Sequence, residues 1–206
     1  MKNPGISVLA AVLAAMLAWM SAAAVAQTPM RIRGTITSLE GNVLGVKARD
    51  GKDLKISLPE NLVVVAAKAI TFADIQPGDF VGPASKAGPD GTLRAISLQL
   101  FPAALRGVVP EGHTPWDLEP GAVMTNASVA TGTAAAGGGR ELKLEYKGGS
   151  QTIVVPDGTP MFTTVPGERT LLVPGAYIVT GARVGIDGVI FTQRITVSKD
   201  GVRPAN

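Results

Sequence analysis

The chain has 206 residues, no cysteine and a formal net charge of +3. The absence of cysteine excludes disulfides, thiol chemistry and thiolate metal sites. Residues 1–26 hold one lysine and no acid, so the remainder carries 18 basic against 16 acidic side chains. A charge of +2 attracts polyanions weakly, and no run of Lys and Arg resembles a nucleic-acid tail. Arg31 and Arg33 are expected at two outward positions of one strand, and nucleic acid is not an expected partner.

Residues 1–26 have the pattern of a secretory signal peptide. Lys2 precedes an apolar stretch at residues 6–20, and Ala24 and Ala26 occupy the small-residue positions of a cleavage site. We expect cleavage after Ala26, which predicts a periplasmic or secreted protein with no membrane span once the signal is removed. An uncleaved anchor is the alternative, because residues 6–26 are about long enough to cross a bilayer.

The rest of the chain has the markers of one module that occurs twice, 97 residues apart. Four pairs of turn residues show this spacing: Pro59 and Pro156, Pro77 and Pro174, Gly88 and Gly185, Asp90 and Asp187. A constant spacing over an ordered set of markers indicates internal duplication. The sequence therefore predicts a first module at residues 27–106, a linker at residues 107–121 and a second module at residues 122–206.

Each module shows the alternation of apolar and polar residues that is typical of antiparallel strands. Residues 44–48 and 54–58 alternate on either side of Asp50 and Gly51, which is a strong hairpin signal. Residues 142–146 and 150–155 repeat the pattern in the second module. Short helical turns are expected near residues 71–75 and 169–172.

Five or six short strands and one helical turn per module favour a small barrel over a sandwich. The predicted fold class is therefore all-β, with two tandem small OB-like β-barrel modules after the signal peptide. A split-barrel or SH3-like arrangement would give nearly the same pattern.

The first module resembles a family of bacterial exported domains of unknown function. The resemblance rests on Gly34-Thr35-Ile36, the hairpin at Asp50-Gly51, the stretch at residues 77–81, and Asp90-Gly91-Thr92-Leu93. It covers residues 30–101 well and residues 122–200 more loosely. The second module departs from it at Ala176 and Thr192. The resemblance implies tandem small OB-like β-barrels in a periplasmic or secreted protein, and the family has no agreed catalytic residues to carry over.

The sequence offers little material for catalysis. A serine nucleophile usually needs a histidine base, and His113 is the single histidine. The chain has no phosphate-binding or dinucleotide-binding glycine pattern. We therefore predict a protein with no catalytic residues, and a carboxylate-dependent hydrolase is the weakest alternative.

The predicted linker contains the best candidates for residues that bind a metal or a partner. Glu111, His113, Asp117 and Glu119 are candidate ligands for zinc, copper or another divalent metal, although one histidine is a poor metal signature. Trp116 is expected to pack between the modules and is the candidate interaction residue.

The favoured function is a non-enzymatic binding or interaction protein of the cell envelope, such as an accessory to a transport or assembly system. Another envelope protein is the expected partner. The alternative is a periplasmic metal-binding protein that uses His113, and no other cofactor is expected.

Overall fold

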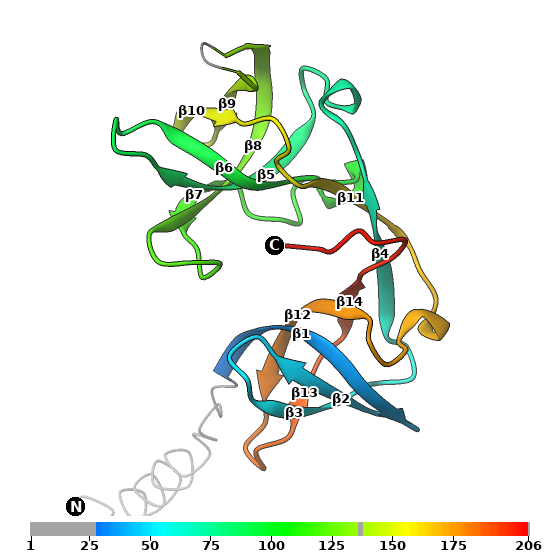
Figure 1. The fold of residues 1–206 in the computed structure, drawn as a ribbon. Helices are drawn as coiled ribbons and strands as arrows, with labels where there is room; N and C mark the ends of the chain where they lie inside the picture. Colours follow the sequence, from blue (N-terminus) through cyan, green and yellow to red (C-terminus); the bar gives the residue numbers. More distant parts are fainter. Residues whose placement is uncertain (1–27, 136–137, 206) are drawn as a thin grey trace, which may run out of the picture.

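The computed structural model describes residues 28–135 and 138–205, and nearly all of their regular structure is β-strand (Figure 1). The predicted signal peptide lies outside the described residues. The strands are β1 (Thr28–Glu40), β2 (Val43–Ala48), β3 (Asp53–Ser57), β4 (Val63–Ala69), β5 (Phe80–Ala87), β6 (Leu93–Leu100), β7 (Gly112–Pro115), β8 (Ala122–Ala134), β9 (Arg140–Tyr146), β10 (Gly149–Val155), β11 (Met161–Pro166), β12 (Tyr177–Val184), β13 (Ile190–Phe191) and β14 (Arg194–Val197). Three short 3-10 helices are η1 (Phe72–Asp74), η2 (Ala103–Leu105) and η3 (Arg169–Leu171). The all-β prediction is confirmed.

Five strands close into a barrel, called ring A here. β1 pairs with β2, β2 with β3, β3 with β13, β13 with β12, and β12 with β1. The β3–β13 contact is parallel and the other four are antiparallel. Inward side chains of these strands form one apolar core, which includes Ile32, Ile36, Leu44, Ile56 and Ile178.

A second closed set of pairings, called ring B, joins five other strands. β6 pairs in parallel with β10, and antiparallel contacts then join β10 to β9, β9 to β8, β8 to β5 and β5 to β6. Its separate apolar core includes Val81, Leu98, Leu142, Leu144 and Ile153. In Figure 1 ring B lies above ring A, and the C-terminal segment runs between them.

Both rings take strands from both sides of the linker predicted at residues 107–121. Ring A combines β1, β2 and β3 with β12 and β13, whereas ring B combines β5 and β6 with β8, β9 and β10. The chain passes from ring A to ring B through β4 and returns through β11. These two strands pair with each other, and they also pair with β14 and β6 respectively. The spatial units therefore do not coincide with the two predicted sequence modules.

Several equivalent contacts keep their register at a shift of 97 residues, although the β1–β12 and β5–β8 registers differ. Ile56 lies opposite Ile190 in ring A, and Ile153 lies opposite Leu93 in ring B. In the β4–β11 pair, Ala67 lies opposite Thr164, which is the residue 97 positions further along the chain. The set of strand pairings is therefore symmetric about the β4–β11 pair, whereas the registers agree only in part.

Local turn chemistry explains the hairpins. Gly51 has a φ of +87°, a conformation that side chains with a Cβ rarely adopt, and it turns the chain between β2 and β3. The predicted helical turn near residue 71 is confirmed as η1, where the Asp74 carboxylate accepts a hydrogen bond from the Thr71 backbone N–H at 2.7 Å. The equivalent turn in the second half is η3. No helix of the described ranges has both the length and the apolarity that a membrane crossing needs.

Candidate binding cleft

The structure does not bring the four predicted metal ligands together. Each is engaged by a different neighbour: Glu111 accepts from the Lys147 backbone N–H (3.0 Å), His113 Nδ1 lies 2.8 Å from Thr125 Oγ1, Asp117 binds Arg31 and Arg33, and Glu119 pairs with Lys86 (3.2 Å). Within residues 28–135 and 138–205, no group of three or more His, Asp or Glu side chains is placed to hold a metal ion. His113 alone of the four lies in β7, which pairs along β8, and the other three bind partners elsewhere in the fold.

The linker instead places Trp116 against ring A. Its backbone N–H donates to Ala122 O at 2.8 Å, which fixes the residue just after β7. The Arg31 guanidinium stacks over the indole, 3.7 Å from the ring centroid, and Arg33 lies 5.9 Å from it. A cation over an indole face is the strongest form of this contact in proteins. Trp116 is therefore held on one face by β1.

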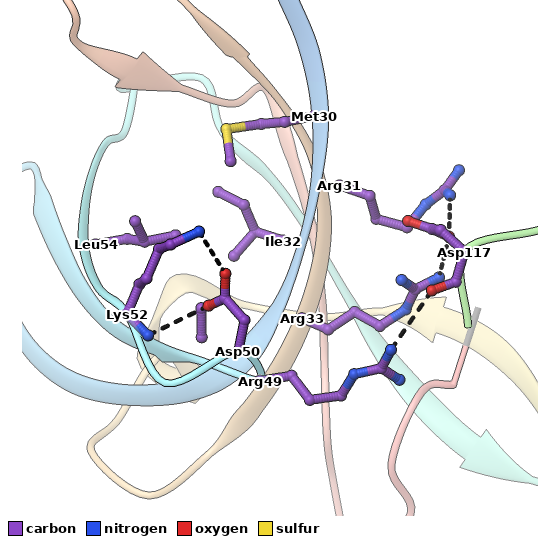
Figure 2. A pocket seen from close by; sticks show the side chains of 10 residues that line it. Met30, Arg31, Ile32, Arg33, Arg49, Asp50, Lys52, Leu54 and Asp117 are labelled. Carbon is purple, nitrogen blue, oxygen red and sulfur yellow. Dashed lines mark hydrogen bonds and ion pairs between the residues drawn. The ribbon is translucent and has the colours of Figure 1, made fainter. Parts of the chain in front are cut away.

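Asp117 fastens the linker to the same strand (Figure 2). Its Oδ1 accepts hydrogen bonds from Arg31 at 2.8 Å and Arg33 at 2.9 Å, and its backbone oxygen accepts from Arg49 at 3.4 Å. Arg33 also donates through Nε to Ala205 O at 3.2 Å. Arg31 and Arg33 do share one face of β1, but Arg33 is only 6% exposed because the linker and the C-terminal segment cover it. One carboxylate thus serves two arginines, which leaves local positive charge in excess.

The Asp117 contacts predict a pH dependence. Burial raises the pKa of Asp117, but the hydrogen bond from Arg33 and the charges of Arg33 and Arg31 outweigh it, so the pKa is lowered. A lowered pKa in the folded state stabilises the protein above the ordinary Asp pKa of about 3.9, and this stabilisation is lost as the pH falls through the folded value.

We therefore expect the stability difference between the wild type and Asp117→Asn to be constant near neutral pH and to shrink in acid. Urea unfolding at a series of pH values measures this difference. The effect should be small and weaker in salt, because the Asp117 side chain is 52% exposed. A difference that did not change with pH would contradict the stabilising role of the contacts between Asp117 and the two arginines.

A pocket of about 220 Å³ opens at one end of ring A, beside this cluster (Figure 2). Met30, Ile32 and Leu54 contribute apolar surface to its lining. The charged groups at its rim already have partners: Lys52 pairs with Asp50 at 2.8 Å, and the arginines bind Asp117. Among the described residues that line this pocket, none carries a shielded polar atom without a partner.

A larger cleft of about 430 Å³ lies between the rings. We name it the Trp116 cleft, and its lining includes Arg31, Phe101, Trp116, Asn126, Thr164 and Arg194. These residues come from strands of both rings, from the segment after β6, from the linker, and from β11 and β14, which lie between the rings. Its volume is in the range that small-molecule sites occupy.

The Trp116 cleft concentrates unsatisfied polar atoms. Among the side chains of the described residues, four shielded polar atoms lack a hydrogen-bond partner, and three of them belong to lining residues: Trp116 Nε1, Asn126 Oδ1 and Thr164 Oγ1. Thr164 is 7% exposed. Leaving such an atom unpaired costs about 1–3 kcal/mol. All three atoms are shielded in this conformation, so a bound molecule would pair with them only after neighbouring side chains move.

Neighbouring hydroxyl groups show that this part of the fold can satisfy buried polar atoms. Thr180 also lines the cleft, and its hydroxyl lies 2.6 Å from the Thr192 hydroxyl and donates to Arg194 O at 2.7 Å. Asn126 uses one side of its amide, because Nδ2 donates to Pro110 O at 3.1 Å. This bond fixes Oδ1 as the unpaired acceptor. The residues of the cleft therefore hold one N–H donor, one oxygen acceptor and one hydroxyl without a partner, all three shielded in this conformation.

The sequence predicted Trp116 as an interaction residue and placed it between the modules, but it gave no reason to choose Asn126 or Thr164. Both occupy strands with ordinary alternation, β8 and β11. Their common position depends on the crossing of β4 and β11 between the rings, which joins residues distant in sequence. No local pattern carries that information.

Comparison of the chain with family models, with curated proteins and with solved structures found no match. The resemblance to exported tandem barrels thus stays a prediction from the sequence. Any function must therefore be inferred from the Trp116 cleft itself.

Proposed function

We propose that the protein is an exported, non-enzymatic binding protein that holds a small molecule in the Trp116 cleft. The observation that carries the proposal is the set of three unpaired polar atoms on Trp116, Asn126 and Thr164 in one cleft. A pocket with apolar walls and a few convergent polar groups is the usual form of a ligand site. Export is supported by the apolar stretch and the small-residue pattern at Ala24 and Ala26. An envelope protein remains the expected partner.

We also infer that the chain arose by duplication of an OB-like module whose halves have exchanged. Support comes from the recurrence of registers at a shift of 97 residues, as in the Ile56–Ile190 and Ile153–Leu93 pairs. Five strands in a closed ring agree with an OB-like barrel. Exchange of this kind creates an interface between the two rings, and the Trp116 cleft lies there.

Metal binding at the linker has less support. Asp117 and Glu119 already form ion pairs, and Glu111 and His113 have hydrogen-bond partners of their own. Binding a metal would require several of these contacts to break at once.

Release of a bound molecule tests the binding proposal. The chain would be isolated without dialysis from the periplasm of a bacterium that exports it, then denatured, and the released molecules measured by mass spectrometry. We expect a near-stoichiometric small molecule from the wild type and at least a tenfold lower yield from Thr164→Val. That substitution keeps the shape of the side chain and removes its hydroxyl.

Thr163→Val is the matched control. Thr163 is next to Thr164 on β11, but adjacent strand residues point to opposite faces and Thr163 does not line the cleft. The control should retain the molecule. Equal yields from Thr164→Val and the wild type, or no released molecule from either, would contradict the proposal.

A further inference from the structure

The walls of the Trp116 cleft carry positive charge without acidic residues. Among the described residues that line it, Arg31 and Arg194 are basic and none is acidic. Arg31 shares the Asp117 carboxylate with Arg33, so that acid neutralises only part of the arginine charge. Opposite charges attract most strongly where water is partly excluded. The cleft therefore favours an anion over a neutral molecule or a cation.

The unpaired atoms add a second requirement. Trp116 Nε1–H is a donor, and the Thr164 hydroxyl can also donate, so both suit the oxygens of a carboxylate. Asn126 Oδ1 can only accept, and the Asn126–Pro110 bond holds it in that role. A ligand that satisfies all three atoms must therefore carry a donor of its own as well as acceptor oxygens, and the arginines favour an anionic group as the acceptor.

The identity of that donor follows from the charge of the cleft. An ammonium group would be placed near two arginines with no acidic side chain among the described lining residues to pair with it. A hydroxyl donates a hydrogen bond without adding charge. The remaining lining, which includes Phe101, Leu105 and Met124, suits an apolar body.

We infer that the Trp116 cleft binds a small hydroxycarboxylate with an apolar side group. This inference rests on the proposed binding function and specifies the ligand class for the same site. The carboxylate faces the arginines and the Trp116 and Thr164 donors, and the hydroxyl donates to Asn126 Oδ1.

Matched probes test the two chemical requirements separately. The full chain would be titrated by calorimetry with three hydroxycarboxylates of increasing size: lactate, 2-hydroxyisocaproate and mandelate. Each would be compared with its uncharged amide and with the acid that lacks the hydroxyl. We expect at least one hydroxycarboxylate to bind ten times or more tightly than both of its matched analogues.

Two variants assign that preference to the cleft. Arg194→Gln should weaken the best hydroxycarboxylate at least tenfold and leave its amide nearly unchanged, because only the charge interaction is lost. Asn126→Asp should weaken the hydroxycarboxylate through repulsion between two anions, whereas Thr163→Val should change neither probe. Circular dichroism would check that each variant is folded.

The outcomes separate this inference from the binding proposal. Equal binding of the amide would overturn the anionic class, and equal binding of the acid without a hydroxyl would overturn the donor. If no hydroxycarboxylate binds but the isolated protein releases another small molecule that depends on Thr164, the ligand class is wrong and the binding function stands. If no probe binds and nothing is released, both proposals fail.

Discussion

Cutting the backbone between Gly107 and Val108 is expected to leave the two halves of the chain associated in one particle. Val108 is 69% exposed and Gly107 has a φ of +78° in a tight turn, so a protease site inserted there should be accessible. Independent modules on a linker would separate after such a cut. Because each ring contains strands from both halves, we expect the opposite result.

Contacts across the cut explain the expected association. β1 pairs with β12 over eight residue pairs, and β5 pairs with β8 over five. β4 pairs with both β11 and β14, and β6 pairs with both β10 and β11. Each half would have to expose part of both apolar cores to leave, and hydrophobic burial is the main force that opposes this.

Gel filtration at micromolar concentration measures the result, and a denaturing gel confirms the cut. The nicked protein should elute with the uncut protein that carries the same insertion. Two separate smaller peaks under native conditions would show that the halves do not share the rings.

Much of the local structure could be predicted because turns and alternation are local signals. The Asp50-Gly51 hairpin and the turn capped at Thr71 depend on residues within a few positions of one another. Which strands make up each ring depends instead on contacts between residues far apart in the sequence. Leu93 and Ile190 are both apolar and occupy equivalent registers in the two rings. Alternation alone therefore does not decide which of the two residues completes which ring.

The site was predictable only where a residue was chemically unusual. Trp116 stood out as an aromatic residue in a linker rich in proline and glycine, and the structure places it in the cleft. The acidic residues of the same linker were candidate metal ligands, but each of them is held by a different partner. Arg31 stacks on an indole that lies far along the chain, and strand periodicity does not encode such a contact.

Ile178→Ala and Leu98→Ala are expected to destabilise the whole chain, although they lie in different cores. Both side chains are fully buried, Ile178 in ring A and Leu98 in ring B. Removing such a side chain to the β-carbon costs about 2–5 kcal/mol through lost burial and the cavity left behind. Because each ring contains strands from both halves and β4 pairs with β11 between them, we expect one cooperative unfolding transition.

Urea unfolding followed by circular dichroism, with hydrogen exchange at single residues, measures that coupling. Each core substitution should lower the midpoint of one transition and speed exchange in the strands of both rings. Ile186→Ala is the control, because Ile186 is 84% exposed and its replacement should change stability by less than about 0.5 kcal/mol. Two transitions, with Leu98→Ala shifting only one, would instead mean that the rings unfold independently. The connection between the rings argues against that outcome. β11 pairs with β6 of ring B, and the chain continues from β11 into β12 and β13 of ring A.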